Sequence, residues 1–72
     1  MEVRLFATLR ENRGKIAHIG WREGITGLDL LDELGIPQKD VAIFLINGAH
    51  SNAGAALNQN DVIALFPPVG GG

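Results

Sequence analysis

ITGLDLLDELGIP, residues 25–37, is the stretch that decides the fold, because it contains one helix together with the signals that begin and end it. Thr26 is a suitable N-cap, and Asp29, three residues later, completes a capping box, while Ile25 and Leu30 occupy the hydrophobic-staple positions. Gly35 stands where a left-handed C-cap belongs, and Pro37 prevents further helix. The sequence therefore predicts one helix over residues 27–34.

The two sides of this helix differ in character. Leu28, Leu31 and Leu34 follow helical spacing, which predicts an apolar side. The acidic residues of the other side are Asp29, Asp32 and Glu33. Such a side either meets a basic partner or is simply solvated, and the solvated surface is the simpler interpretation.

Two strands are predicted before the helix. Val3, Leu5 and Ala7 alternate with their neighbours at the period of a strand that turns one side to a core, which places a strand at residues 2–7. Residues 8–14 are mostly polar and are expected to form a loop, followed by a second strand at residues 15–19. The buried face of this second strand stays open, because Ile16 and Ile19 have opposite parity.

Two further strands are predicted after the helix. Residues 41–46 are a continuous apolar run closed by Asn47-Gly48, a strong turn dipeptide. A run without alternation implies that both of its faces are covered, either within the domain or by a partner. Residues 49–60 are small and polar, with Leu57 as the large apolar anchor, and are expected to be irregular with at most a short strand. The last strand is expected at residues 62–66.

This order of elements is typical of a β-grasp domain. The predicted fold class is α+β, with a mixed sheet of four to five strands and one main helix packed on one face. Residues 1–66 would form this ubiquitin-like domain, and residues 67–72 a flexible tail. The pattern by itself leaves other small α+β arrangements open.

Composition limits the function classes. The chain has 72 residues, 46% of them hydrophobic, a formal net charge of −2 and no cysteine, so we expect one small domain that folds by packing alone. The net charge argues against nucleic-acid binding. No apolar run approaches the roughly 20 residues of a membrane span, and no signal peptide is evident, so we expect a cytoplasmic protein without a membrane partner.

The basic residues are unevenly distributed along the chain. Four of the six fall within the first fifteen positions, at Arg4, Arg10, Arg13 and Lys15. Because Glu2 and Glu11 lie among them, we interpret this region as a solvated hairpin rather than as a binding patch.

The last seven residues are Phe66-Pro67-Pro68-Val69-Gly70-Gly71-Gly72. Two prolines favour an extended polyproline backbone that holds the tail away from the domain. If extended, residues 67–72 span about 20 Å, and glycine passes through narrow channels because it has no Cβ. The Gly72 carboxylate could then enter a partner's active site, whereas the alternative is an idle, frayed terminus.

Here the sequence resembles the MoaD/ThiS family of ubiquitin-like sulfur carriers. The tail is similar to the Pro-Pro-Val-x-Gly-Gly ending of MoaD, the small subunit of molybdopterin synthase. Residues 3–11, Val-Arg-Leu-Phe-Ala-Thr-Leu-Arg-Glu, are similar to the first strand and following loop of the family, and Ile46-Asn47-Gly48 to its Val-Asn-Gly turn. Leu57 and Asp61-Val62 are similar to its approach to the last strand. Departures are Asn60, where glycine is usual, Gly70 in a triple glycine, Trp21, and the stretch 49–56.

The resemblance implies a mechanism in which the chain itself is the substrate. The Gly72 carboxylate would be activated by an ATP-dependent, MoeB/ThiF-like adenylating enzyme and converted to a thiocarboxylate by a sulfur donor. The acceptor would be a molybdopterin precursor on the MoaE-like large subunit of molybdopterin synthase. Phe66, Pro67, Pro68, Val69, Gly70 and Gly71 would contact these partners. ATP would be used by the activating enzyme, and no cofactor would be bound stably.

Relatives of this shape also serve tungsten-cofactor assembly, thiamine synthesis, sulfur supply to amino-acid synthesis and protein conjugation, so these alternatives stay open. Phe44, Phe66 and Val69 are candidates for a partner-facing apolar surface, although core placement is the simpler interpretation of Phe44. His18 and His50 have no ligand cluster near them in sequence, so no metal site is expected. We expect no catalysis by this chain alone. It could still be the non-catalytic subunit of an enzyme.

Overall fold

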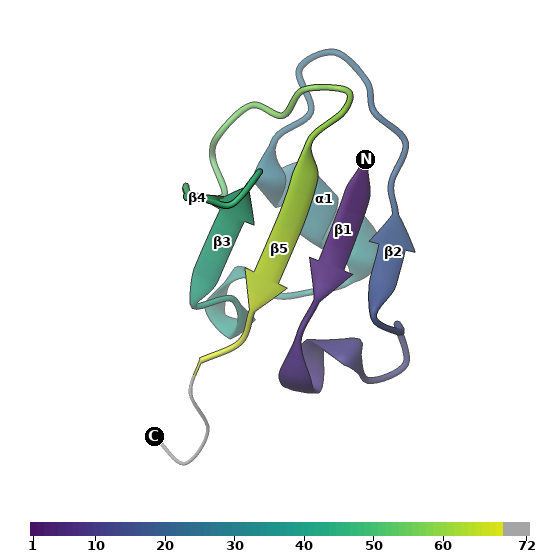
Figure 1. Cartoon of the computed structure of the whole chain (residues 1–72), viewed down its shortest axis with the longest axis vertical. Coiled ribbons are helices and arrows are strands. Elements are labelled where there is room, and N and C mark those ends of the chain that lie inside the picture. The colour runs from purple at the N-terminus through teal and green to yellow at the C-terminus, as the bar shows by residue number, and fades with distance from the viewer. Residues whose placement is uncertain (69–72) are drawn as a thin grey trace.

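The computed structural model describes residues 1–68, and Figure 1 shows a single sheet with one α-helix behind it. The elements, in chain order, are β1 (Glu2–Leu5), the 3-10 helix η1 (Ala7–Arg10), β2 (Ile16–His18), α1 (Gly27–Leu34), the 3-10 helix η2 (Gln38–Asp40), β3 (Ile43–Ile46), β4 (Ala49–His50) and β5 (Val62–Phe66).

The sheet has five strands in the order β2-β1-β5-β3-β4. The central pair, β1 and β5, is parallel, and the other pairs are antiparallel. This mixed sheet with one helix across a face is the β-grasp arrangement, so the predicted α+β fold class is confirmed.

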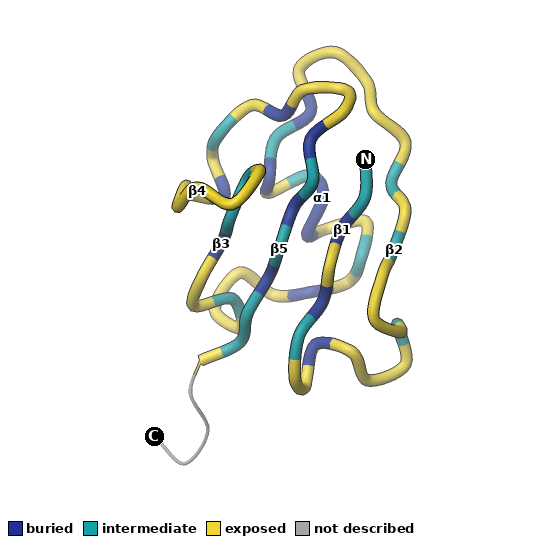
Figure 2. Tube along the Cα trace, in the orientation of Figure 1, coloured by how far each residue is buried: buried dark blue, intermediate teal, exposed yellow. Residues whose placement is uncertain are grey.

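The core lies between α1 and the inner face of the sheet. Figure 2 shows buried residues alternating along β1 and β5, as expected for strands with one covered face. The largest fully buried side chains are Val3, Leu5, Ile25, Leu30, Ile63 and Leu65. Leu57 is also buried, so its predicted role as the anchor of the irregular segment is confirmed.

Helix α1 spans the predicted residues, and both predicted caps are present. The Thr26 hydroxyl oxygen accepts from the Asp29 N–H at 3.4 Å, while the Asp29 carboxylate accepts from the Thr26 N–H at 3.0 Å. Gly35 ends the helix in the left-handed region with φ 70°. Leu28, however, is 45% exposed, so its inclusion in the apolar side was wrong. The buried side is centred on Leu30 and Leu31, which face the sheet.

The small-residue segment around residue 53 closes over the start of α1. The N–H groups of Gly27 and Leu28 donate to the carbonyl oxygens of Ala55 and Ala53, at 3.2 and 2.7 Å. A Cβ at Gly27 would lie 2.7 Å from the Ala53 oxygen and 2.7 Å from Phe44 Cζ. The unusual composition of residues 49–56 thus has a structural reason, because helix and segment approach backbone to backbone.

The remaining predictions differ from the structure mainly at their ends. The first strand stops at Leu5, and the expected loop 8–14 contains most of η1, because Ala7 turns the chain with φ 52°. The third strand begins at Ile43 rather than at residue 41. The Asn47-Gly48 turn is confirmed by positive φ at both residues, and the expected short strand is β4.

Candidate functional site

The candidate site is the end of the sheet from which the tail leaves. Because β1 and β5 are parallel with Leu5 opposite Leu65, the residues that follow, Phe6 and Phe66, lie side by side on the outer face. Their rings stack with centroids 4.2 Å apart and an interplanar angle of 7°. Stacked aromatic rings in contact, when offset from each other, contribute beyond their buried area. The pair therefore forms a rigid aromatic platform at the root of the tail.

The outer face of the sheet continues this platform as an apolar surface. Ile43 pairs with Phe66 and Leu45 with Ala64, so these four side chains share the face opposite the core. Ile43 is 38% exposed, and the other three are half-buried. Within residues 1–68, this side of β3 is only partly covered, so the alternative in which the domain itself covers both faces of this strand does not hold. Coverage by a partner stays a prediction.

Phe44 points the other way. It is only 5% exposed and belongs to the core, so the simpler of its two interpretations holds and its alternative role at a partner surface was wrong. Phe66 is half-buried on the outer side. After it, Pro67 is half-buried and Pro68 is exposed. Val69, Gly70, Gly71 and Gly72 lie outside the described residues, and their roles stay predictions.

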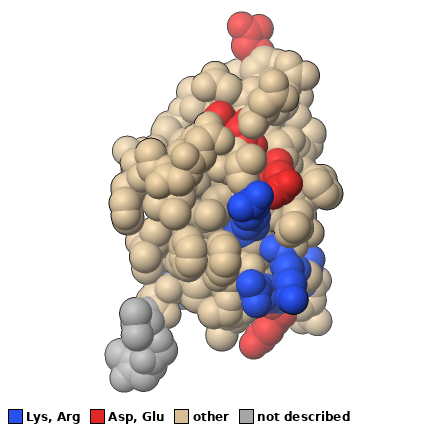
Figure 3. All heavy atoms as spheres, viewed as in Figure 1, with Lys and Arg blue, Asp and Glu red and all other residues tan. Residues whose placement is uncertain are grey.

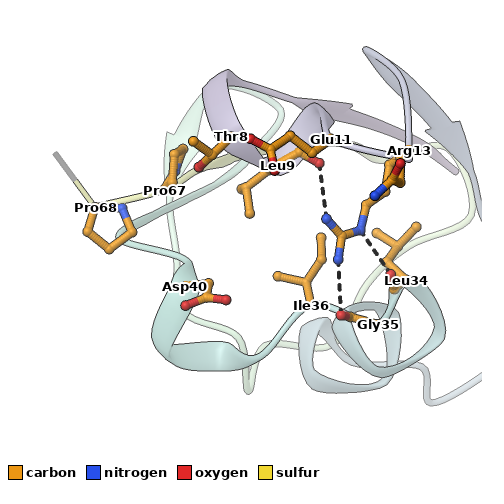
Figure 4. A pocket seen from close by; sticks show the side chains of 11 residues that line it. Thr8, Leu9, Glu11, Arg13, Leu34, Gly35, Ile36, Asp40, Pro67 and Pro68 are labelled. Atoms are coloured by element: carbon orange, nitrogen blue, oxygen red, sulfur yellow. Dashed lines mark hydrogen bonds between the residues drawn. The ribbon is translucent and has the colours of Figure 1, made fainter. Parts of the chain in front are cut away.

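A groove of about 660 Å³ runs beside the root of the tail (Figure 4). Leu9 and Ile36 form its apolar floor, with Pro67 and Pro68 at one end. The guanidinium of Arg13 lies along its wall. Its N–H groups donate hydrogen bonds, drawn in Figure 4, to the carbonyl oxygens of Leu34 at 3.1 Å, Gly35 at 3.1 Å and Leu9 at 3.4 Å.

Arg13 thereby supplies a cation to the C-terminal end of α1, whose last turn contains no basic residue. The helix macrodipole and the unpaired carbonyls make this end a favourable place for positive charge. We conclude that the groove wall ties the β1–β2 connection to the helix. Arg13 thus has a structural role in the groove wall.

His18 and His50 are both exposed, and residues 1–68 contain no cluster of three His, Asp or Glu side chains able to hold a metal ion. Asp29 has its pKa lowered below the ordinary value of 3.8, first by the backbone N–H of Thr26 and then by the Thr26 hydroxyl. Both bonds belong to the helix cap, so this shift has a structural origin.

Sequence reasoning did not foresee that Phe6, Arg10 and Phe66 would meet. Phe6 entered as a residue of the first predicted strand and of the resemblance, and Arg10 as part of a basic region and of the same resemblance. A signal was present, because Phe6 and Phe66 each follow a buried leucine at the end of a strand, which turns both outward. Their contact still required the parallel register of β1 and β5.

Comparison with known families decides the classification. The ThiS family model matches residues 3–72, nearly the whole chain. The chain belongs to the ThiS family. As a ThiS-family protein of MoaD/ThiS type, it is a small ubiquitin-like carrier rather than an enzyme, and members act with adenylating enzymes and partner subunits.

Solved structures agree on the fold. This ThiS-family chain is similar to SAMP1 from Haloferax volcanii, with 29% identity, a TM-score of 0.78, and coverage of 99% of this chain and 97% of the other. A second crystal structure, of H. volcanii small archaeal modifier protein 1, shows 28% identity and a TM-score of 0.78, covering 94% and 95%.

A third similar structure is a putative molybdopterin converting factor, subunit 1, from Pyrococcus furiosus. Its identity is 24% and its TM-score 0.75, with 94% and 95% of the two chains covered, so it supports the fold alone. No curated protein matches the sequence. Within residues 1–68, no helix has the length and apolar character needed to cross a membrane.

Proposed function

We propose that this chain is a sulfur carrier whose C-terminal Gly72 is adenylated, converted to a thiocarboxylate, and used to donate sulfur in molybdopterin biosynthesis. The observation that carries the proposal is the ThiS family match, which extends through residue 72 and so includes the glycine tail. The choice of molybdopterin rests on the similarity of residues 66–72 to the Pro-Pro-Val-x-Gly-Gly ending.

The geometry of the tail root supports this role. The tail leaves β5 directly after Phe66, which is held by the Phe6 ring and by the main-chain bond from the Ala42 N–H to the Phe66 oxygen at 2.8 Å. A tail anchored at its root presents its far end within a limited volume. With about 20 Å of extended reach over six residues, the Gly72 carboxylate could enter a deep active site while the apolar outer face docks beside it.

The proposed chemistry has two steps. A carboxylate oxygen of Gly72 attacks the α-phosphorus of ATP, and pyrophosphate leaves to give an acyl adenylate. Hydrosulfide supplied by the donor then attacks the acyl carbon, AMP departs with the electron pair of the broken C–O bond, and loss of the proton leaves the thiocarboxylate. Both steps occur in the active site of the adenylating enzyme, and this chain contributes the acyl group and the docking surface. The acceptor would be a molybdopterin precursor on a MoaE-like subunit.

A second candidate function is conjugation to other proteins. It is favoured by the similarity to H. volcanii small archaeal modifier protein 1, at 28% identity over most of both chains. The same acyl adenylate would then be attacked by a lysine amine, and Gly72 would become joined to a target through an isopeptide bond. Transfer to thiamine or amino-acid synthesis would differ from the leading proposal only in the acceptor.

Intact-mass measurement tests the proposal. The chain is incubated with its adenylating enzyme, ATP and a sulfur donor, and we expect the mass increase of one oxygen exchanged for sulfur. A matched chain lacking Gly71 and Gly72 should remain unchanged. Glycine-tagged lysines on other proteins, without this mass increase, would favour conjugation instead. If the shortened chain supports the organism's cofactor synthesis as well as the full chain does, both tail-based functions are wrong.

A further inference from the structure

Arg10 lies against the aromatic platform at the root of the tail. Its Nε–H donates to the Leu5 carbonyl oxygen at 2.8 Å, and its guanidinium carbon lies 5.4 Å from the centroid of the Phe6 ring. A guanidinium within about 6 Å of an aromatic ring is held there by cation–π attraction. Arg10 is thus an exposed cation with two attachments, unlike a freely moving surface side chain.

The charge of Arg10 has no carboxylate partner in the part of the chain that the structure describes. Within residues 1–68, the ion pairs are Arg4 with Glu2 and Arg22 with Glu33. The hydrogen bonds found for the Arg10 side chain in this range use Nε alone. A guanidinium offers five N–H donors in a planar fork that suits a carboxylate, so most of its binding capacity remains.

Arg10 also belongs to a local excess of positive charge. Figure 3, which views the outer face of the sheet, shows Lys and Arg side chains gathered over the corner formed by β1, η1 and β2, with acidic side chains at the upper and lower ends of this cluster and a broad surface without charge beside it. Residues 1–15 contain four basic residues and the two acidic residues Glu2 and Glu11. This corner is positive although the whole chain has a formal net charge of −2. Charge placed beside an apolar docking surface selects partners and steers their approach.

The position of Arg10 excludes a direct part in the chemistry at Gly72. An extended tail carries the carboxylate about 20 Å from Pro67, whereas Arg10 packs against Phe6 at the root. If the tail entered the active site of the activating enzyme in an extended form, a cation at its root would lie at the outer surface of that enzyme.

We propose that Arg10 is a specificity-determining residue that pairs with a carboxylate on the adenylating enzyme, next to an apolar patch that receives Phe6 and Phe66. The inference rests on the proposed function, since it names the partner surface for that same tail. The partner surface is accordingly an apolar patch with an acidic side chain at its edge. The ion pair between that carboxylate and Arg10 fixes the orientation in which the tail enters the active site.

The test measures ATP–pyrophosphate exchange by the purified adenylating enzyme of the same organism, with the carrier as variable substrate. Arg10→Gln should raise KM for the carrier about tenfold and leave kcat unchanged at saturation. Arg10→Lys, which keeps the charge, should recover part of the loss. The matched control is Arg22→Gln, which removes an exposed cation paired with Glu33 on the helix and should leave KM unchanged.

The dependence of KM on NaCl concentration distinguishes loss of an ion pair from a general structural effect of the substitution. Raising NaCl from about 50 mM to about 300 mM should increase KM of the original chain and change that of Arg10→Gln much less. Thermal melts of all variants establish folding at the assay temperature. An unchanged KM for Arg10→Gln, an equal change in Arg22→Gln, or a fall in kcat alone overturns the inference. Exchange with the original chain would in each case still support adenylation of Gly72, the first step of the proposed function. Absence of exchange with the original chain overturns the proposed function and this inference together.

Discussion

The close approach of another backbone segment to Gly27 predicts a large effect from a small substitution, Gly27→Ala. The added Cβ would lie 2.7 Å from the Ala53 carbonyl oxygen, 2.7 Å from Phe44 Cζ and 3.0 Å from the Ala53 Cα. Two of these atoms are backbone, and Phe44 is 5% exposed, so none can move freely. The hydrogen bond from the Leu28 N–H to the Ala53 oxygen, 2.7 Å long, would also be displaced.

The magnitude follows from two opposing terms. Overpacking of a buried site destabilises by about 1–3 kcal/mol. Alanine is favoured over glycine in a helix by about 0.5–1 kcal/mol, which offsets part of that loss. We therefore expect the free energy of unfolding to fall by about 1–2 kcal/mol. For a domain of this size, the midpoint of thermal unfolding should fall by about 5–15 °C.

Urea and thermal unfolding followed by far-UV circular dichroism measure this change. The matched control is Gly20→Ala, because a Cβ at Gly20 meets nothing within 4 Å and its φ is not in the left-handed region. The control should unfold within about 0.5 kcal/mol of the original chain. If Gly27→Ala is as stable as Gly20→Ala, the close approach of residues 53–55 to the helix is not part of the folded state.

Three further predictions concern the helix cap and the aromatic platform. Thr26→Ala should reduce the free energy of unfolding by about 1 kcal/mol, measured by urea unfolding, because the cap hydroxyl is lost; an unchanged value would contradict the cap. Asp29→Asn should be less stable than the original chain at neutral pH. Because folding lowers the Asp29 pKa, the carboxylate stabilises above its ordinary value of 3.8, and this contribution is lost as pH falls through the lower folded pKa. The two unfolding curves should therefore converge in acid, and a constant difference down to low pH would refute this linkage. In a double-mutant cycle of Phe6→Leu and Phe66→Leu, the stack should appear as a coupling free energy of about 0.5–1.5 kcal/mol, whereas additive effects would show that the rings do not interact.

Features encoded over a few neighbouring residues were predictable. The bounds of α1 followed from Thr26 and Gly35, and the hairpin between β3 and β4 from Asn47-Gly48. Caps and turns act through hydrogen bonds and backbone angles of residues within about four positions of one another, so sequence alone is sufficient for them. The order of elements and the glycine tail then indicated the β-grasp fold and the family.

Features that join distant residues required the tertiary structure. Leu28 obeys helical spacing yet is exposed, because the direction from which the sheet approaches α1 selects Leu30 and Leu31 instead. Arg13 reaches the helix end from another loop, and residues 53–55 cap the helix start across the fold.

The aromatic platform belongs to the same class. Sequence by itself placed Phe6 within the first predicted strand and Phe66 at the end of the last one, and showed that a glycine tail follows the second of them. That the rings touch, with Arg10 beside them, was decided only when β1 and β5 paired in parallel and in register. The physical reason is that strand periodicity assigns a side chain to a face, whereas its neighbours on that face depend on which strands pair and at what offset.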